Sequence, residues 1–578
     1  MKSILSKIIN PDEKYLWLLF VLFSALYFLT YIQGNMVLRS YAGHDDALYF
    51  TMGQNISAGN WLGEYHSLTL AKAPSYAIFI ALSILSGIPY LWMIAACNIF
   101  AVSFLLRKSR YLFDKMKLLS LLAGVLLLFN PIFAQTLRVY RFQLPAICFL
   151  VFIGSLITIF NPAEKKSHRS SEVIDAVTVF VAWGFLWFSR EESLFYFGCL
   201  VVALTAFFAV KKVSSYPIRN LTPVLYGLSG VLIFWIFICG MNNKYYSRPI
   251  VCEKTSSPYT DVIKTFHSIA DPDFPQNISG SAASLEKILT IAEVVPFFKP
   301  MAGHLINSTK LWRGTYFDRQ TLEFVGIPRT MLTVSHFEWA WITAAKTGGY
   351  YKDASTLAEF YTQLDKELEK AIREGRLLTR KDTLVQAGPY FLLKRDLATI
   401  IRLIPKYYFF VFPKPNEIAL WYQNLLVQIS SNSIGNEGSR KAWGEHLNVH
   451  YIAEGDVQRY DECLNSFANR FWNKATEIYA YTAVPLMHLA TPIAFITLIL
   501  LLIRRKWVPA AVITVLSSMY IAHYLMLIGV TVASGYYAAH VRYFLPSYHA
   551  VILNSFVSIG ALLSLLSRHE NIKPESCS

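Results

Sequence analysis

The amino-acid sequence predicts an all-α polytopic membrane protein with about ten transmembrane helices, and three observations support this fold class. First, 54% of the 578 residues are hydrophobic and only 16% are charged, which is too apolar for a soluble chain of this length. Second, the apolar residues gather in blocks of roughly the 20 residues that one helical span needs. Third, Lys and Arg lie in short loops between alternate blocks, as the positive-inside rule requires.

The charge balance bears on the class of partner. The formal net charge is +15, and a basic chain can be a nucleic-acid binder. Here the basic residues lie between apolar blocks, so the charge is mainly a topology signal and we expect no nucleic-acid partner. Aromatic residues make up 15% of the chain, which suits a protein with two membrane–water interfaces.

The apolar blocks give the predicted topology. The first block is too long for a signal-peptide core and no small-residue cleavage site follows it, so it is interpreted as a retained membrane helix. Segment Pro74–Gly87 is apolar but short, and we assign it to a juxtamembrane or re-entrant helix. Both termini are then cytoplasmic, in a bacterial inner membrane. The predicted spans are about Tyr15–Ile32, Tyr90–Leu106, Leu118–Phe129, Leu144–Phe160, Val173–Phe188, Leu194–Val210, Leu221–Cys239, Thr482–Ile503, Val508–Val530 and Phe544–Leu566.

Three parts of the chain follow from these spans. Residues 1–240 form an N-terminal transmembrane module with a first exoplasmic loop at 34–89, and residues 476–578 form the C-terminal membrane helices. Between them, residues 241–475 are polar and long enough for a mainly helical exoplasmic (periplasmic) domain. Cys252 and Cys463 both lie in this domain, so a disulfide between them is possible in an oxidising compartment.

Two stretches of the polar region have a helical pattern. The run Glu338–Leu377 is rich in helix-forming residues, and its apolar stripe is interpreted as core packing. The run Ile400–Phe412 is too short and too interrupted to span a membrane, so we expect an interfacial helix there. The stripe consists of Phe360, Leu364, Leu368 and Ile372.

The first exoplasmic loop contains the residues that indicate chemistry. Asp45 and Asp46 lie side by side just after the first span, and ionisable groups at a membrane boundary usually have a function. Adjacent carboxylates raise each other's proton affinity, which suits one of them to act as a general base. Alternatively, the two residues cap the helix that follows, since Asp is a favoured N-cap residue. Both interpretations can hold together.

This loop resembles the first loop of the GT-C glycosyltransferases, especially the lipid A aminoarabinose transferase and protein O-mannosyltransferase group. The resemblance rests on an acidic pair, a Gly–polar–Trp turn and a Lys-x-Pro segment, and it departs at Ala73 and Ser75, where a Pro pair and a Gly are common. His540 to Pro546 is similar to the entrance to the last helix of these enzymes. The three elements are Asp45-Asp46, Gly59-Asn60-Trp61 and Lys72-Ala73-Pro74.

The resemblance implies an inverting transfer of a sugar from a polyprenyl-phosphate donor to a glycan, lipid or protein acceptor. It gives Asp45 the role of general base and makes Asp46 a residue that orients the acceptor or a cation. Lys72 and Arg542 would bind the donor phosphate, because a leaving phosphate needs positive charge. For both, the alternative role is snorkelling to the interface.

Further candidates carry secondary roles. The reserve phosphate-binding residues are Arg138, Arg141 and Arg190, and the acceptor-side or secondary residues are Glu191, Glu192 and Tyr543. An ion pair of Arg190 with one of the two glutamates is the alternative. The Asp pair could bind a divalent ion through its oxygens, but the basic residues could replace a metal, so we expect no required cofactor.

Two rival functions remain. A polymerase or ligase of surface polysaccharide would also have about ten spans and a large exoplasmic loop, but it would tolerate loss of Asp45. A transporter or lipid flippase would place charged residues at mid-membrane depth, whereas the spans here are nearly free of charge. The sequence therefore favours sugar transfer.

Overall fold

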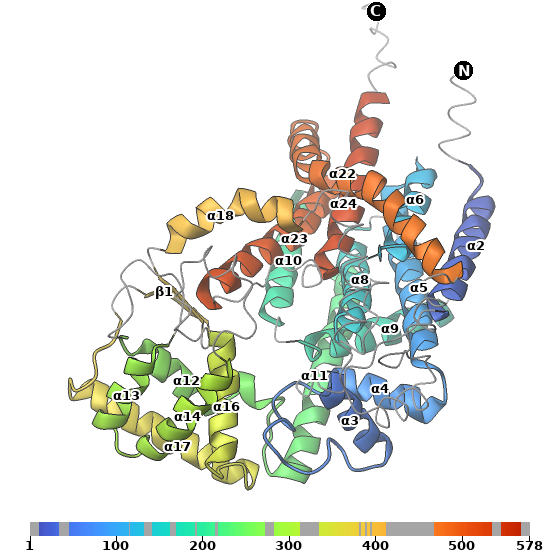
Figure 1. The fold of residues 1–578 in the computed structure, drawn as a ribbon. Helices are drawn as coiled ribbons and strands as arrows, with labels where there is room; N and C mark the ends of the chain where they lie inside the picture. The colour runs from blue at the N-terminus through green and yellow to red at the C-terminus, as the bar shows by residue number, and fades with distance from the viewer. Residues whose placement is uncertain are drawn as a thin grey trace, which may run out of the picture.

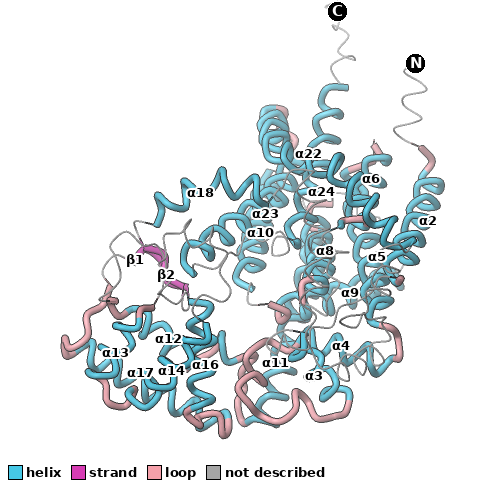
Figure 2. The backbone as a smooth tube through the Cα atoms, in the orientation of Figure 1, coloured by secondary structure: helices cyan, strands magenta, loops and turns pink. Residues whose placement is uncertain are grey.

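The structure is a computed structural model, and its fold is almost entirely helical, as the sequence predicts (Figures 1 and 2). One two-stranded antiparallel pair, β1 (Thr383–Ala387) with β2 (Tyr390–Leu393), is the only sheet among the described residues, and it was not predicted. The structure describes residues 11–33, 46–114, 116–131, 141–161, 169–190, 193–213, 218–271, 283–312, 334–380, 383–387, 390–393, 396–411, 467–534 and 545–567.

Seven helices of the described chain are long and apolar enough to cross a membrane. Each coincides with a predicted span, so the protein is a polytopic α-helical membrane protein. The seven are α2 (Glu13–Ile32), α5 (Tyr90–Ser109), α10 (Ser193–Val213), α11 (Thr222–Tyr246), α22 (Phe467–Ile503), α23 (Trp507–Ser534) and α24 (Leu545–Ser567).

The other three predicted spans are also helices, namely α6 (Lys117–Leu128), α8 (Gln143–Thr158) and α9 (Arg169–Trp187). With 12 residues, α6 is about 18 Å long, well below the roughly 30 Å of a bilayer core. It ends just before Asn130-Pro131, where proline was expected to stop it. Helix α4 (Ser75–Ser86) is equally short, in agreement with its assignment as a segment that does not span. The total of about ten spans stays a prediction.

Helix α22 begins well before the predicted span and crosses the boundary that was placed at residue 475. Its first turns are polar on one side, which hides them from a hydropathy pattern. Their buried side contains Trp472, which packs edge-on against Tyr27 and Tyr31 of α2 and donates to the Thr30 carbonyl at 3.4 Å. The start of α22 therefore packs against the end of α2 and is hydrogen-bonded to it.

The polar domain has a hydrophobic core of its own. The predicted helical run Glu338–Leu377 is divided into two helices by a turn, in which Gly349 adopts a left-handed φ of +76°. Phe360, Leu364 and Leu368 are buried, so their interpretation as core residues is confirmed. The helices of the domain are α12 (Tyr259–Ser268), α13 (Leu285–Val294), α14 (Lys299–Trp312), α16 (Val334–Thr347) and α17 (Ala354–Arg373).

The second helical prediction, Ile400–Phe412, corresponds to α18 (Asp396–Val411). This helix packs on α23, and the Tyr524 hydroxyl donates to the Ile404 carbonyl. Strand β2 also contacts α23. The hairpin and α18 thus link the polar domain to the C-terminal membrane helices.

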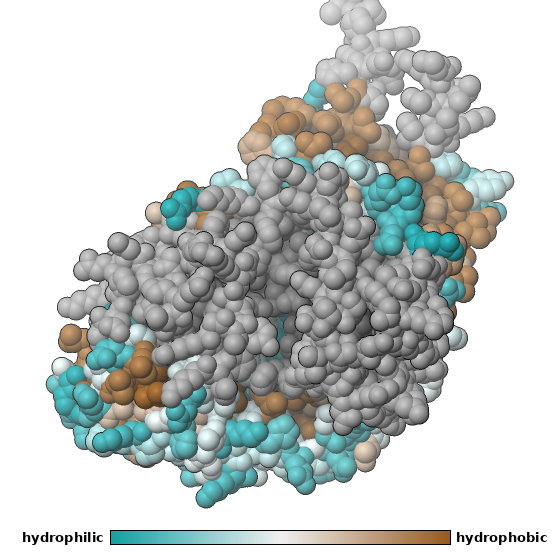
Figure 3. Space-filling view, in the orientation of Figure 1, coloured by the Kyte–Doolittle hydropathy of each residue, from teal (hydrophilic) through white to brown (hydrophobic). Residues whose placement is uncertain are grey.

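The two ends of the membrane region differ (Figure 1). Helix α2 begins and α24 ends on one side, whereas α3 (Asp46–Ser57), α4 and the polar domain lie toward the other. In the space-filling view, hydrophobic residues cover the side of the molecule near α2, and hydrophilic residues dominate the lower edge over the first loop and the domain (Figure 3). The first loop and the polar domain therefore share one end of the molecule.

Helices α9 and α11 make the most extensive contact between any two helices of the described chain. Glycines permit this approach: a methyl group added at Gly230 would collide with the backbone oxygen of Phe180, and one at Gly227 with the Trp183 ring. Small residues are the usual means of close helix packing in membranes. These two helices consequently form a closely packed pair, and the first loop contacts the last turns of α11.

Candidate functional site

The first loop is attached to the last turns of α11. Trp61 is buried and donates from Nε1 to the Asn242 side chain at 2.7 Å. Its backbone is left-handed, with φ at 50°, which is uncommon for a bulky residue. The Tyr245 and Tyr246 hydroxyls donate to the carbonyls of Gly59 and Gly63 at 3.1 and 2.8 Å. The Gly–polar–Trp turn singled out in the sequence is thus a structural anchor.

Two glycines shape this turn. Gly59 and Gly63 have φ values of +83° and +94°, which an L side chain rarely adopts. A methyl group at Gly63 would also collide with the Asn55 side chain, whose Nδ2 donates to the Leu62 carbonyl at 3.1 Å. At Gly59 there is open space. The turn therefore needs glycine at Gly63 for two separate reasons.

A second anchor ties the loop to the short 3-10 turn η3 (Glu253–Thr255) at the start of the polar domain. The Tyr65 hydroxyl donates to the Glu253 carboxyl at 2.6 Å, and the Glu253 backbone N–H donates to the Leu70 carbonyl at 2.7 Å. Desolvation raises the pKa of the Glu253 carboxyl to about 7, while the Tyr65 hydrogen bond and the charge of Arg248 oppose the rise. Glu253 was not singled out from the sequence.

Lys72 lies where the first loop meets the polar domain. Its side chain is buried, with 5% exposure, and its Nζ lies 5.6 Å from the ring centre of Tyr49 in α3 and 5.8 Å from that of Trp339 in α16. Lys254 lies near the same indole at 4.4 Å and pairs with Glu338 at 2.8 Å. We call these five residues the lysine–tryptophan cluster. It brings positive charge from the loop and from the domain to one aromatic ring.

A chain of buried polar side chains continues from this cluster toward the membrane helices. Tyr49 packs edge-on against Tyr76, whose hydroxyl is hydrogen-bonded to that of Tyr90. Tyr90 donates to Gln143 at 3.4 Å, and Gln143 donates to Tyr31 at 2.6 Å. These bonds join α4, α5, α8 and α2, so they fix the position of α3 and Lys72 at one end of the spans.

Two of the predicted reserve residues, Arg141 and Arg190, lie near the start of α8. The buried guanidinium of Arg190 lies over the ring of Phe142, with 4.6 Å between its central carbon and the ring centre. Arg141, which precedes Phe142, is half-buried. Gln143, the next residue, belongs to the polar chain that leads to Lys72. Arg141 and Arg190 are therefore near the same helix start, on the side of the spans that carries the loop.

Of the remaining predicted site residues, the structure describes only Asp46. Asp46 is the first residue of α3, but its side chain lies outside the described part of the structure, so its capping and acceptor-orienting roles stay predictions. The other six site predictions, and Cys463 of the possible disulfide, lie outside the described residues. The six are Asp45, Arg138, Glu191, Glu192, Arg542 and Tyr543.

Within the described part of the chain, no group of three or more His, Cys, Asp or Glu side chains is placed to hold a metal ion. Asp45 lies outside the described residues, so the expectation that no metal is required stays a prediction.

No family model matches the sequence, and no curated protein matches it. Among solved structures, the crystal structure of ArnT from Cupriavidus metallidurans bound to undecaprenyl phosphate aligns with 98% of this chain and 82% of its own, with 14% identity and a TM-score of 0.31. A similarity of this size identifies neither a family nor an activity, so the function is inferred from the chain's own residues.

Proposed function

We propose that the protein is a membrane glycosyltransferase that transfers a sugar from a polyprenyl-phosphate donor to a cell-surface acceptor. One observation carries the proposal: a buried lysine of the first loop, Lys72, lies at the contact with the polar domain, beside two aromatic rings and a second lysine. Two cations, one from the loop and one from the domain, meet at one aromatic ring, and this concentration of positive charge suits an anionic ligand. A lipid-linked phosphate would bring such an anion to this end of the spans.

The chemistry assigns one task to each group. Asp45 takes the proton from the acceptor hydroxyl, and the hydroxyl oxygen attacks the anomeric carbon from the face opposite the phosphate. The bond between the anomeric carbon and the phosphate oxygen breaks, and its electron pair leaves with the polyprenyl phosphate. Lys72 and Arg542 stabilise the charge that develops on the leaving phosphate. Attack from the opposite face inverts the anomeric configuration.

The acceptor is proposed by class. A hydroxyl of lipopolysaccharide, of O-antigen or of another surface glycan fits an enzyme at the outer face of a bacterial inner membrane, ahead of a protein hydroxyl. The polar domain would select the acceptor, because α16 contributes Trp339 to the lysine–tryptophan cluster and a planar ring can pack against a sugar face.

The test is a transfer assay with the purified full chain in nanodiscs and a panel of polyprenyl-phosphate sugars. Wild type should transfer at least one sugar, and Asp45→Asn should lose at least about 100-fold in rate, since removal of a general base costs about 10²–10⁴-fold. Asp114→Asn is the matched control, because Asp114 is an exposed carboxylate at the other end of the spans and should be silent.

Three outcomes would contradict the proposal. Equal rates for wild type and Asp45→Asn would remove the general base and favour the polymerase or ligase. No transfer from any donor, or movement of lipid across the bilayer without transfer, would favour the flippase.

A further inference from the structure

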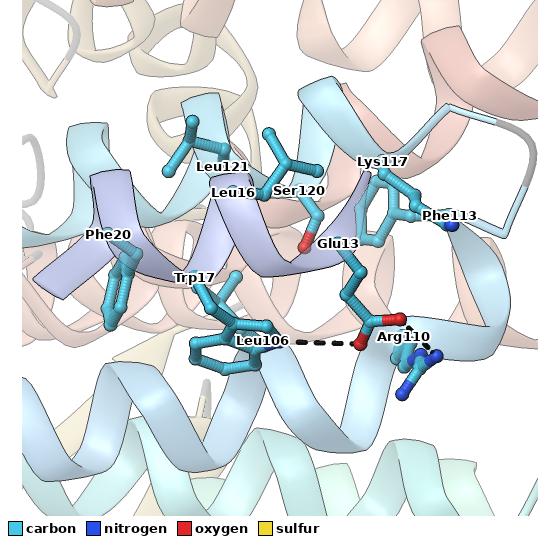
Figure 4. Close-up of a pocket in the computed structure, with 10 residues that line it drawn as sticks. All are labelled: Glu13, Leu16, Trp17, Phe20, Leu106, Arg110, Phe113, Lys117, Ser120 and Leu121. Carbon is cyan, nitrogen blue, oxygen red and sulfur yellow. Dashed lines mark hydrogen bonds and ion pairs between the residues drawn. The ribbon is translucent and has the colours of Figure 1, made fainter. Parts of the chain in front are cut away.

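A half-open pocket lies at the end of the membrane region opposite the first loop, where the starts of α2 and α6 meet the end of α5 (Figure 4). It has a volume of about 60 Å³. Leu16, Phe20 and Leu121 make its apolar wall, and Glu13 and Arg110 lie near one another at its edge. Apolar walls with a few charged groups are typical of sites for amphipathic ligands.

The charged groups of this pocket do not cancel. Glu13 forms an ion pair with Arg110 and accepts from the Trp17 indole at 3.4 Å. Lys117 also lines the pocket, and within the described chain no ion pair or hydrogen bond is found for its ammonium group. With two cations and one carboxylate, the pocket has a net charge of +1, which one anionic phosphate group would neutralise.

An apolar groove continues from the pocket along α2. The groove has a volume of about 480 Å³, shares Trp17 and Phe20 with the pocket, and reaches Leu29 beside Ile99 of α5. The small side chains of Ser24 and Ala25 leave it open. From Trp17 to Leu29 the helix rises about 18 Å, which is close to one leaflet, half of the roughly 30 Å hydrocarbon core.

We propose that the pocket and groove together bind one anionic phospholipid, with its phosphate at Lys117 and Arg110 and one acyl chain along α2 and α5. Charge complementarity selects this occupant. A headgroup with one net negative charge leaves the pocket neutral, whereas a zwitterionic headgroup adds an ammonium group beside two existing cations. The positive-inside distribution predicts that this end faces the cytoplasmic leaflet, where basic side chains meet anionic lipids.

This site is separate from the proposed transfer site. The lysine–tryptophan cluster lies with the first loop, at the other end of α2. A bound lipid would hold α2 against α5 and α6, and we expect it to raise the thermal unfolding midpoint of the protein. Failure of the lipid site would therefore leave the transferase proposal untouched, and the reverse also holds.

The first experiment is native mass spectrometry of the full chain, with phosphatidylglycerol and phosphatidylethanolamine of identical acyl chains. We expect retention of one phosphatidylglycerol and at least tenfold weaker retention of phosphatidylethanolamine. Lys117→Gln should remove the preference. Lys506→Gln is the control, because Lys506 is an exposed cation in the loop between α22 and α23 and lines neither the pocket nor the groove.

A second pair of variants tests the groove. Ala25→Trp should fill it and weaken lipid retention at least tenfold, whereas Leu22→Trp, at an exposed position outside the groove, should not. Equal retention of the two lipids, identical behaviour of Lys117→Gln and Lys506→Gln, or displacement of the lipid by inorganic phosphate at equal concentration would overturn the proposal. An unfolding midpoint equal to that of wild type for all four variants in lipid-free detergent shows that they fold.

Discussion

Two buried lysines, Lys72 and Lys287, show different uses of a charge inside the protein. Lys287 is fully buried in the polar domain, where its ammonium donates to the Ile269 carbonyl at 2.7 Å and lies 5.1 Å from the Phe266 ring centre. These groups all belong to the same domain. Lys72 instead lies between rings from two separate parts of the chain, Tyr49 and Trp339.

Burial of a lysine therefore does not by itself identify a binding site, since Lys287 and Lys72 are both buried. Burial lowers the pKa of Lys287 well below the usual lysine range, the charge of Arg380 lowers it further, and Asp271 opposes both. Such a lysine is held by groups of its own domain and serves the core. Lys72 instead lies where the first loop meets the polar domain, and a ligand bound at this contact would touch both parts of the chain.

The largest effect is expected for Lys72→Gln, which tests whether Lys72, unlike Lys287, has a role in activity. Loss of a group that stabilises the leaving phosphate should lower kcat/KM at least about 100-fold, and Lys72→Arg should restore part of it. Lys287→Met is the matched variant, and it should lower the unfolding midpoint while kcat/KM of the folded enzyme stays constant. Full activity of Lys72→Gln with any donor would show that both lysines are structural.

The glycines of the first loop test how much the turn before Lys72 contributes to the stability of the loop that positions this lysine. Gly63→Ala should cost about 1–3 kcal/mol for the left-handed backbone and additional free energy for the collision with Asn55. Gly59→Ala has the same backbone constraint without the collision, so it should be the milder of the two. The measurement is the thermal unfolding midpoint in detergent. A larger loss for Gly59→Ala would show that the Asn55 contact does not hold the turn.

The smallest effect is expected from pH, at the anchor between Tyr65 and Glu253. The pKa of Glu253 in the folded state, about 7, is above its usual value, so the stability that it contributes is fully present below pH 4.5. That contribution is lost as the pH rises through 7. We expect the unfolding midpoint of wild type, relative to Glu253→Gln, to fall by a few degrees between pH 5 and pH 8. Parallel pH profiles for the two proteins would contradict this assignment.

The sequence predicted the membrane helices because their signal is local. Twenty apolar residues in a row need no knowledge of their neighbours in space, and each of the ten predicted spans is a helix. The early start of α22 escaped because its first turns bury only one side, with Trp472. The division between α16 and α17 was signalled by Gly348-Gly349, a pair that the helical pattern around it obscured.

The candidate site was only partly predictable. Lys72 was singled out through its place in a short motif, and its role in phosphate binding stays a prediction. Lys254, Glu338 and Trp339 escaped because they lie far along the chain in a domain without a familiar motif, and only the fold brings them to Lys72. A charged pair a few residues after α11, Glu253-Lys254, was the one local signal available.

The tight packing of α9 against α11 has a mechanical consequence for substrate exchange. Because a methyl group at Gly230 has no room against Phe180, the two helices cannot slide past each other without separating. The first loop is bonded to the last turns of α11, through Trp61 and Asn242, and is therefore carried on a stiff support. Under the proposed function, room for a bulky acceptor would come from displacement of α16 and its Trp339 rather than of the loop.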